Sequence, residues 1–289
     1  MKLSIIIVNY NTYNLTKQTI ESIIQKEHAF EYEILLVDNA SSDGSIEKLQ
    51  QEFNELMFKG ILQIFINKAN LGFAKANNIG IRVANGEYIL LLNSDTVVNE
   101  DCLELCIKQM NENTNIGALG CKVVLPDGTL DHACKRGFPT PKVSFYYLLK
   151  LHKRDPIKYG QYDALHLHED EAGEVDSLMG AFMLMPKAVL NEIGLLDEDF
   201  FMYGEDIDLC YRIKEGGYKI LYYPKAQITH HKGGSSKKKR TKVIYDFHKA
   251  MWIFYKKHYY KKYNFAITLL VYIGIWAKYL LKIIKNALN

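Results

Sequence analysis

Short apolar runs alternate with amphipathic segments in the first half of the chain. The apolar runs lie at residues 3–8, 32–38, 61–67 and 88–93, and their content of β-branched and aliphatic residues predicts strands. The segments between them, at 14–26, 41–53 and 72–84, repeat apolar positions at helical spacing. Continuous apolar strands joined by helices are typical of a parallel sheet covered on both faces. The pattern therefore predicts an α/β sandwich of the nucleotide-binding type, with a mostly parallel central sheet.

The second half of the chain is less regular. Residues 121–133 read as a strand, a Pro-Asp-Gly turn and a second strand, and residues 137–175 predict an irregular, mobile region. Residues 175–194 predict a strand interrupted at Gly180 and then a helix entered at Pro186. Residues 204–224 predict a helix followed by a strand.

The last part of the chain is basic, aromatic and apolar. Residues 243–263 are dense in aromatic residues and lysine, and residues 265–284 are strongly apolar, interrupted by Lys278. The uninterrupted apolar core at 265–277 is shorter than the ~20 residues that usually span a bilayer. We therefore favour a helix lying in a membrane interface. A packing or oligomer helix and a true span remain the alternatives.

Bulk composition adds three constraints. The net charge of +3 is too small to indicate a nucleic-acid partner. The first ten residues, MKLSIIIVNY, lack the apolar region and cleavage site of a secretory signal, so we expect a cytoplasmic body. The cysteine number is odd and no C-x-x-C occurs, which predicts buried reduced thiols. These cysteines are Cys102, Cys106, Cys121, Cys134 and Cys210.

Polar side chains follow each predicted strand of the first half. Ligands bind α/β sheets outside the carboxyl ends of the strands, so these side chains should line one edge of the sheet. They are Asn9, Tyr10 and Asn11, Asp38 and Asn39, Asn67 and Asn70, and Asn93, Ser94 and Asp95.

Two acids of this edge have both a ligand-binding and a structural interpretation. Asp95 at a strand end could bind a divalent cation, because one protein carboxylate suffices when ligand phosphates contribute. Alternatively, Asp95 or Ser94 could cap a helix near residues 99–110. Asp38 is placed to accept hydrogen bonds from a base or a ribose, but it also begins a segment rich in turn-forming residues.

A second acidic group and a histidine pair lie in the second half. Glu205, Asp206 and Asp208 begin a predicted helix, where they suit the helix dipole. Asp208 and Arg212 have ion-pair spacing, whereas Glu205-Asp206 follows an aromatic run and could supply a general base.

His230 and His231 point to opposite faces if they lie on a strand, so only one of them can serve a given site. That histidine is either a metal ligand or structural. Residues 233–236, Gly-Gly-Ser-Ser, suit backbone contact with an anion or a linker.

These blocks occur in an order and spacing that resemble glycosyltransferase family 2. The fold of that family is called GT-A, and the similarity is greatest to its bacterial rhamnosyltransferase-like branch. The resemblance covers residues 1–236, with a nucleotide-binding half at 1–115 and an acceptor-side half at 116–236. It leaves residues 237–289 as a helical, membrane-associating tail. The matching blocks are residues 4–23, 34–45, 67–81, 88–98, 177–224 and 228–236.

The resemblance implies a role for each candidate residue. Asn9, Asn11 and Asp38 would hold the base and ribose of a nucleotide-sugar. Four residues would lie along the nucleotide and the neighbouring strand edge: Asn70, Gly72, Lys75 and Asn78.

The reacting centre follows from the same resemblance. Asn93, Ser94 and Asp95 stand at the D-x-D position of the family, where Asp95 would bind Mn²⁺ or Mg²⁺. His230 would complete the metal site or touch the diphosphate. Gly180 and Ala181 would let the acceptor approach, and Glu205-Asp206 would carry the catalytic base, with Asp206 preferred.

Asn93 departs from the D-x-D pattern, because its position can carry an acid in the family. We expect weaker metal binding without donor as a result. The implied reaction is direct displacement with inversion at the donor sugar. A dTDP-deoxysugar such as dTDP-rhamnose is the expected donor, ahead of UDP-hexoses, and a glycan on a polyprenyl diphosphate at the inner membrane face is the expected acceptor. A sugar nucleotidyltransferase and a non-catalytic nucleotide-sugar-binding protein of this fold are the alternatives.

Overall fold

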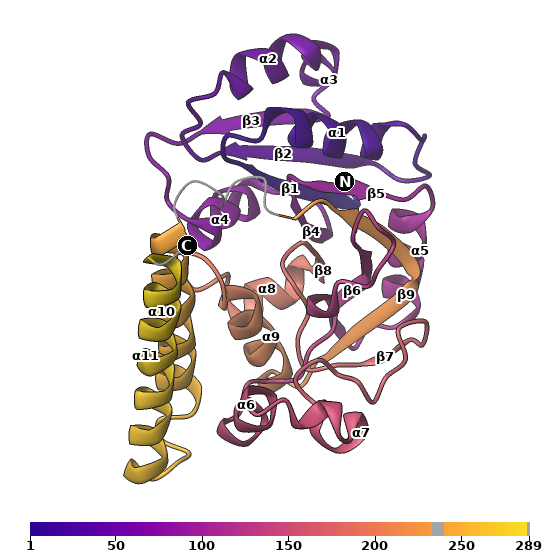
Figure 1. Ribbon diagram of the computed structural model, residues 1–289. Coiled ribbons are helices and arrows are strands. Elements are labelled where there is room, and N and C mark those ends of the chain that lie inside the picture. Colours follow the sequence, from indigo (N-terminus) through magenta and orange to yellow (C-terminus); the bar gives the residue numbers. More distant parts are fainter. Residues whose placement is uncertain (233–239, 288–289) are drawn as a thin grey trace.

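The computed structural model describes residues 1–232 and 240–287, and Figure 1 shows their arrangement. The first half forms the predicted parallel sheet, in the order β3-β2-β1-β4. Its strands are β1 (Leu3–Asn9), β2 (Tyr32–Asp38), β3 (Leu62–Ile66) and β4 (Tyr88–Asn93). Its helices are α1 (Tyr13–Ile24), α2 (Ser45–Glu52), α3 (Asn54–Phe58) and α4 (Phe73–Val83).

The second half extends the same sheet from β4 to give the order β3-β2-β1-β4-β8-β6-β9-β5. Strands β6 (Ile116–Val124) and β9 (Lys219–His230) are parallel to each other, while β8 (Phe182–Pro186) runs antiparallel between β4 and β6. Strands β5 (Thr96–Val98) and β7 (Gly173–Glu174) pair antiparallel with β9. The predicted α/β sandwich is therefore confirmed. The remaining helices of this body are α5 (Cys102–Glu112), α8 (Lys187–Ile193) and α9 (Glu205–Glu215).

Three local predictions are corrected. The second strand expected at 121–133 is reduced to an isolated bridge between Val124 and Leu130, because the chain then turns into a 3-10 helix, η1 (His132–Cys134). The irregular stretch at 137–175 contains α6 (Pro141–Leu148), η2 (Leu151–Lys153) and α7 (Pro156–Tyr159). Helix α5 begins after Asp101, so neither Ser94 nor Asp95 caps it.

All five cysteines are free and buried, as predicted. Cys102 and Cys106 lie on the buried face of α5, and Cys121 lies on β6 beneath it. They fill core volume as small apolar side chains.

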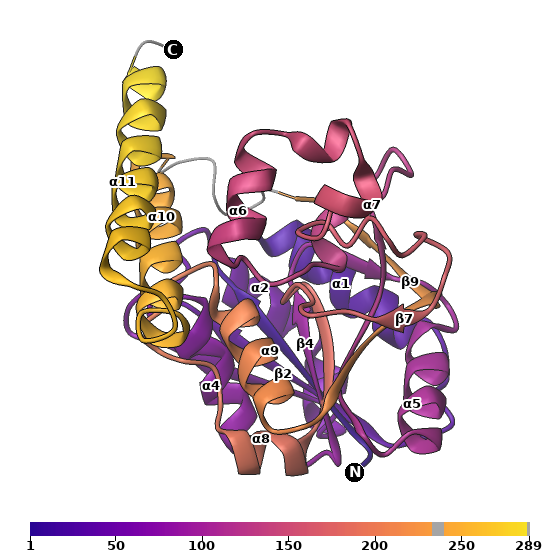
Figure 2. The ribbon, with the colours of Figure 1, turned by 90° about the horizontal axis from the view of Figure 1, so that it is seen from below.

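The tail is a helical hairpin packed along α9. Helix α10 (Arg240–His258) contacts α9 and α11 (Phe265–Ala287) runs back along α10, so the two stand as a column beside the sheet (Figures 1 and 2). A hydrophobic cluster, aromatic except for Ala250, joins the tail to the body and is formed by Phe200, Tyr211, Ala250, Phe254, Tyr255 and Tyr259. The boundary predicted at 236/237 lies outside the described residues.

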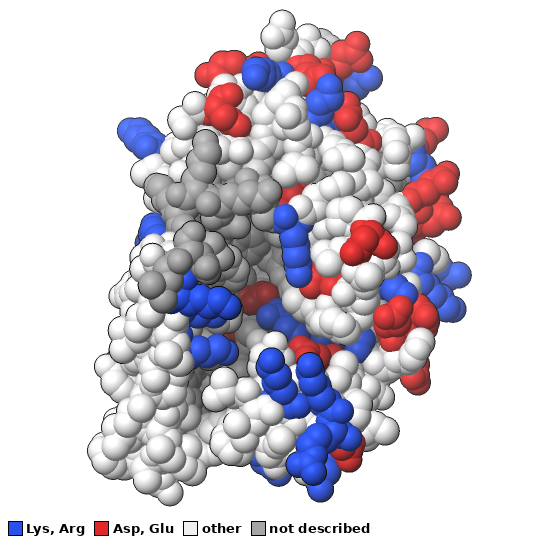
Figure 3. All heavy atoms as spheres, in the orientation of Figure 1, with Lys and Arg blue, Asp and Glu red and all other residues white. Residues whose placement is uncertain are grey.

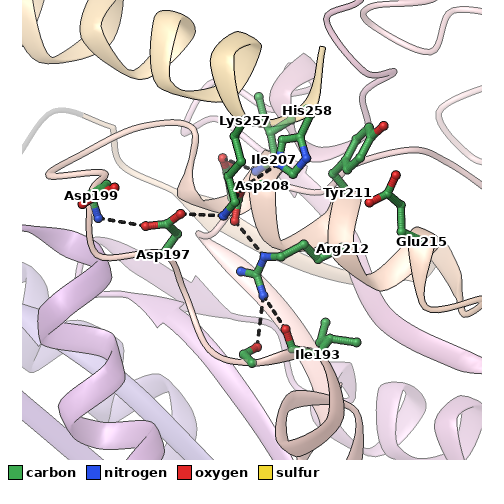
Figure 4. Close-up of polar contacts among 12 residues, drawn as sticks. Ile193, Asp197, Asp199, Ile207, Asp208, Tyr211, Arg212, Glu215, Lys257 and His258 are labelled. Carbon is green, nitrogen blue, oxygen red and sulfur yellow. Dashed lines mark hydrogen bonds and ion pairs between the residues drawn. The ribbon is translucent and has the colours of Figure 1, made fainter. Parts of the chain in front are cut away.

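A buried carboxylate fixes this packing. Asp208 on α9 is fully buried and accepts hydrogen bonds from Arg212 (2.9 Å) and from His258 of α10 (2.7 Å), and it pairs with Lys257 (2.8 Å) (Figure 4). The predicted Asp208–Arg212 pair is thus present. Burial opposes the ionised form, but hydrogen bonds from His258 and Lys257 prevail and lower the pKa of Asp208 to about 2.

Replacing Asp208 with Asn is expected to reduce the free energy of unfolding by about 3 kcal/mol, because several cations lose their buried partner. The lowered pKa makes this stabilisation present above the ordinary carboxyl pKa of ~4 and lost as the pH falls toward 2. Denaturant unfolding at neutral and acidic pH measures both effects. Asp199→Asn is the matched control, because Asp199 is exposed. Equal stability of the two variants would contradict the role of Asp208.

Candidate active site

The ends of β1 and β2 are joined by buried polar side chains. The Asn9 amide donates to Asp38 Oδ1 at 2.8 Å, and Asn9 Oδ1 accepts hydrogen bonds from the hydroxyls of Thr12 and Thr16. The other Asp38 oxygen accepts from the Ser41 backbone at 2.9 Å. Asn9 and Asp38, predicted from separate strands, are thus brought together at one sheet edge, where they fix the loop that follows β2.

Asn11 lies at the same sheet edge, two residues after the end of β1. Its backbone is in the left-handed region, with φ of 54°, and its Oδ1 accepts a hydrogen bond from the Ser42 backbone at 2.7 Å. The Asn11 backbone N–H donates to the Ser41 hydroxyl at 2.9 Å. Asn11 therefore holds residues 41 and 42 against β1, beside Asp38.

Asn39, which the sequence predicts at this edge beside Asp38, organises the neighbouring loop. Its amide donates to Asn70 Oδ1 (3.0 Å) and to the Gly72 carbonyl (3.1 Å), while its Oδ1 accepts from Asn67 and from the Leu71 backbone. Its predicted place at the edge, directly after Asp38 at a strand end, is therefore confirmed. Asn70, a predicted nucleotide residue, is held in place by Asn39.

Gly72 is required by a close approach of the backbone. Its φ is 86°, and a Cβ there would lie 2.3 Å from the Phe201 carbonyl, which accepts a hydrogen bond from the Phe73 backbone. The start of α4 is thereby fixed against the loop that leads into α9.

The two other predicted residues of α4 differ in their surroundings. Lys75 is exposed. Asn78 is buried. Its Nδ2 donates hydrogen bonds to the Leu196 carbonyl and the Glu198 carboxylate, and its Oδ1 accepts one from the Leu196 backbone, so it joins α4 to the loop before α9.

Asp95 and His230 meet beyond the end of β4. Asp95 Oδ1 lies 3.1 Å from His230 Nε2, and the Asn93 amide lies 3.4 Å from the same nitrogen. His231 is bonded through its backbone N–H to the Asp95 carbonyl, so His230 is the histidine that faces this acid. Ser94 contacts the Thr12 hydroxyl at 3.3 Å, which ties this turn to the β1 edge.

Asp131 supports His230 from the other side and was not selected from the sequence. Asp131 Oδ2 lies 3.4 Å from His230 Nδ1, and Lys232 donates to Asp131 Oδ1 at 2.7 Å. Burial disfavours the charged imidazole, but hydrogen bonds with Asp131 and Asp95 prevail and raise the pKa of His230 to about 9. Burial raises the pKa of Asp131, yet His230 and Lys232 lower it to about 2 overall.

The donor set of this pair suits a divalent cation that arrives with further ligands. Asp95 offers a carboxylate oxygen. His230 would offer an imidazole nitrogen after it releases the proton that its raised pKa retains at neutral pH. Metal-binding histidines commonly have a carboxylate on the second ring nitrogen, as Asp131 provides. In residues 1–232 and 240–287, no group of three or more acidic, His or Cys side chains could hold a metal. Phosphate oxygens and water would complete the coordination.

The acidic pair begins α9. Asp206 Oδ2 accepts a hydrogen bond from Arg136 at 2.6 Å and contacts the Gly180 backbone N–H at 3.3 Å. Its neighbour Glu205 is buried, and one of its oxygens has no partner among the described residues. Burial and then the charge of Asp206 raise the pKa of Glu205 to about 8, so Glu205 is mainly protonated at neutral pH. Arg136 was not predicted as part of the site.

Gly180 and Ala181 connect the acidic pair to the β4 edge. The Gly180 N–H faces Asp206, while the Ala181 carbonyl accepts a hydrogen bond from the Asn93 backbone at 3.1 Å. A Cβ at Gly180 would lie 3.1 Å from the Phe73 ring. Figure 3 shows a hollow in this face of the molecule, with acidic and basic side chains at its floor.

This arrangement matches a known family. The family described as glycosyl transferase family 2 matches residues 4–162, more than half of the chain. The chain belongs to glycosyl transferase family 2. The matched range holds the strand-end residues through Asp95, as well as Asp131 and Arg136. It ends before Glu205 and His230.

Curated relatives agree with this assignment. The chain is 26% identical over 226 residues to poly-beta-1,6-N-acetyl-D-glucosamine synthase of Staphylococcus epidermidis, which covers 78% of the chain and 48% of the relative. The chain thus spans about half of that synthase. It is 24% identical over 233 residues to N-acetylglucosaminyl-diphospho-decaprenol L-rhamnosyltransferase of Mycobacterium tuberculosis, which covers 76% of the chain and 73% of the relative.

Solved structures show the same GT-A fold. The mannosyltransferase PcManGT from Pyrobaculum calidifontis, in complex with GDP-Man and Mn²⁺, superposes with a TM-score of 0.62 at 18% identity, covering 89% of the chain and 63% of that structure. GalNAc-T7 with UDP, GalNAc and Mn²⁺ has a TM-score of 0.61 at 19% identity, covering 80% of the chain and 44% of that structure. The predicted family and fold are confirmed.

Proposed function

We propose that this protein is a metal-dependent, inverting glycosyltransferase that moves a sugar from a nucleotide-sugar to a glycan or lipid-linked acceptor. One observation carries the proposal. A short path of contacts leads from Asp206 through Gly180 and Ala181 to Asn93, whose amide faces the His230 ring that contacts Asp95. The proposed base and the proposed metal ligands therefore border one site.

The nucleotide would bind across the ends of β1, β2 and β4. Asp38 and Asn9 are positioned by their mutual hydrogen bond, and Asn11 fixes the loop beside them. The Asp38 carboxylate and the Asn11 amide suit the hydrogen-bonding edges of a base and a ribose. Asn9 is buried with both amide atoms bonded, so it would hold Asp38 in position. Asn70 and Gly72 border this region from the loop that Asn39 holds.

Mn²⁺ or Mg²⁺ would be held by Asp95 and His230 together with the donor diphosphate. Such an ion would supply positive charge to the leaving phosphate. Asp131 keeps the His230 ring oriented, and Asn93 adds an amide rather than a second carboxylate.

Asp206 would take the proton from the attacking acceptor hydroxyl. Glu205 is a poor candidate for this role, because it is buried and holds its own proton at neutral pH. Arg136 pairs with Asp206 in this structure, so it keeps the carboxylate turned toward Gly180. Gly180 and Ala181 are buried, so they would border the acceptor side through their backbone, with the Gly180 N–H beside Asp206.

The donor we favour is a dTDP-deoxysugar such as dTDP-rhamnose, with UDP-hexoses second. The name of the mycobacterial relative supports a rhamnosyl donor and a polyprenyl-diphosphate acceptor. The Haloferax volcanii relative, at 28% identity over 223 residues, is named a hexosyltransferase, which keeps hexoses open. Measuring Mn²⁺-dependent hydrolysis of a panel of nucleotide-sugars tests the proposal. If the protein hydrolyses none of these nucleotide-sugars, the proposed function is wrong.

The tail would attach the protein to the inner face of the cytoplasmic membrane. Helix α11 is long and apolar enough to cross a membrane, and only 11% of its most apolar stretch is buried. Exposed side chains along it include Phe265, Leu270 and Leu281, which are 79%, 69% and 69% exposed. Lys278 and Lys282 accompany them, which favours an interfacial position over a span.

Serine at Leu270, Leu281 and Ile284 is expected to release the protein from vesicles, because these exposed side chains contribute apolar area to the lipid. Co-sedimentation with liposomes measures the effect. The matched control places serine at Phe58, Ile66 and Val83, which are exposed elsewhere. Removing all of 243–289 is a less clean test, since it strips α10 from the buried hydrophobic cluster. Unchanged sedimentation of the α11 variant would show that this face is not the anchor.

A further inference from the structure

A second surface beside the hollow combines apolar and basic side chains. Residues 141–159, containing α6, η2 and α7, have no buried residue. Aromatic contacts hold the segment together, with the Tyr146 and Tyr159 rings 4.8 Å apart and the Tyr147 and Tyr162 rings 4.7 Å apart. We call these nineteen residues the 141–159 segment.

The 141–159 segment exposes several large apolar side chains. Phe145 and Leu148 are each 55% exposed, Leu149 is 52% exposed and Ile157 is 75% exposed. A single exposed apolar side chain needs no explanation, but a group of them within one short segment marks an interaction site.

Positive charge accompanies these apolar side chains in the same segment. The segment has five basic residues and one acid, a net charge of +4, and all five basic side chains are exposed. None of the five pairs with an acid in the part of the chain that the structure describes. The acid, Asp155, caps α7 through the Lys158 backbone. The basic residues are Lys142, Lys150, Lys153, Arg154 and Lys158.

The 141–159 segment and the tail flank the hollow. In the orientation of Figure 3, basic side chains gather below the hollow over α6 and α7, while the α10–α11 hairpin forms its left border. Figure 2 shows α6 and α7 on the same side of the body as the C-terminal end of α11. The two exposed apolar surfaces therefore border the same opening.

We propose that the 141–159 segment is a second membrane contact that binds an anionic lipid surface. Apolar side chains ringed by lysine and arginine are suited to insert at the headgroup level while the cations meet anionic lipids. Two contacts on one molecule strengthen each other, because the first holds the second near the bilayer. The hollow then opens toward the membrane between the two contacts. The benefit to catalysis rests on the proposed lipid-linked acceptor, whereas the lipid contact itself does not.

Charge reversal in the full chain tests the contact. Lys150→Glu, Lys153→Glu and Arg154→Glu together are expected to weaken binding to phosphatidylcholine vesicles containing phosphatidylglycerol by about tenfold or more. Binding to phosphatidylcholine alone should change little. The matched control reverses three exposed lysines on or just after α2, α3 and β3, elements that lie at the opposite end of the body from α6 and α7 (Figure 1), and it should leave binding unchanged. These are Lys48, Lys59 and Lys68.

A second variant tests the apolar component. Phe145→Ser, Leu148→Ser and Ile157→Ser together should weaken binding to both kinds of vesicle, with the secondary structure retained, because all three side chains are exposed. Unchanged vesicle binding of both triple variants overturns the proposal. So does a self-associating wild-type protein that the serine variant converts to monomer in sedimentation, because the surface would then bind a second copy.

The vesicle assay needs no donor. Its result therefore stands even if no nucleotide-sugar is turned over, and the two proposals can fail separately. If both hold, the triple variants should retain hydrolysis of a soluble donor and lose transfer to an acceptor embedded in anionic vesicles.

Discussion

Asp206→Asn is expected to abolish sugar transfer while nucleotide binding persists. The asparagine keeps the size of the side chain but cannot accept the proton of the acceptor hydroxyl. General base catalysis contributes about 10²- to 10⁴-fold, so transfer should fall by at least that lower bound. The measurement is the initial transfer rate with the donor found in the screen, alongside nucleoside diphosphate affinity by calorimetry.

Glu205→Gln is the matched control. Glu205 is buried beside Asp206 and its pKa is raised to about 8, first by burial and then by the charge of Asp206. Glutamine reproduces its protonated form, so the rate at neutral pH should change little. If Asp206→Asn transfers sugar at the wild-type rate, or if only Glu205→Gln loses transfer, Asp206 is not the catalytic base. Unfolding of each variant should be measured too, because Asp206→Asn also removes the partner of Arg136.

The sequence predicts most of the proposed donor side of the site. Asn9, Asp38 and Asp95 each end or follow an apolar run, and the carboxyl ends of parallel strands share an edge. The alternation of apolar strands with helices therefore places these three residues, which are far apart in the chain, at one edge of the sheet. The parallel pairing of β1 with both β2 and β4 confirms that placement.

The partners of the reacting groups could not be predicted in the same way. Asp206 bonds Arg136, which is 70 residues away, and His230 faces Asp131 at a separation of 99 residues. Both partners lie just after β6, where the chain leaves the sheet and no repeat marks which side chain turns inward. Pairing between polar groups far apart in the chain depends on how the two halves of the protein pack. The local sequence pattern carries no information about that packing.

The tail shows the same limit. Its apolar and aromatic content predicts helices, but not that His258 would reach Asp208 on α9, fifty residues earlier. A charged residue at the first turn of a helix usually suits the dipole and stays solvated. Here α10 covers it, so the helix that carries Asp206 is braced by the tail.

Asp95→Ala is expected to eliminate the metal dependence of donor binding. The wild-type protein should bind nucleoside diphosphate about tenfold or more tightly with Mn²⁺ than without it, and the variant should bind equally in both conditions. The fold should persist, because His230 keeps Asp131 as a partner. Calorimetry with and without Mn²⁺ measures the difference, and the titration without metal serves as the control for the nucleotide pocket.

Asn93 sharpens this experiment. Asn93 stands where an acid could stand. Among the described residues, Asp95 is therefore the only carboxylate that contacts His230 Nε2, while Asp131 contacts the other ring nitrogen, Nδ1. Mn²⁺ alone should then bind weakly to the wild-type protein, and Asn93→Asp should tighten that binding by supplying a second oxygen ligand. Tight binding of Mn²⁺ by the wild-type protein without nucleotide would contradict a site completed by the donor. Unchanged Mn²⁺-dependent nucleotide binding in Asp95→Ala would remove Asp95 from the site altogether.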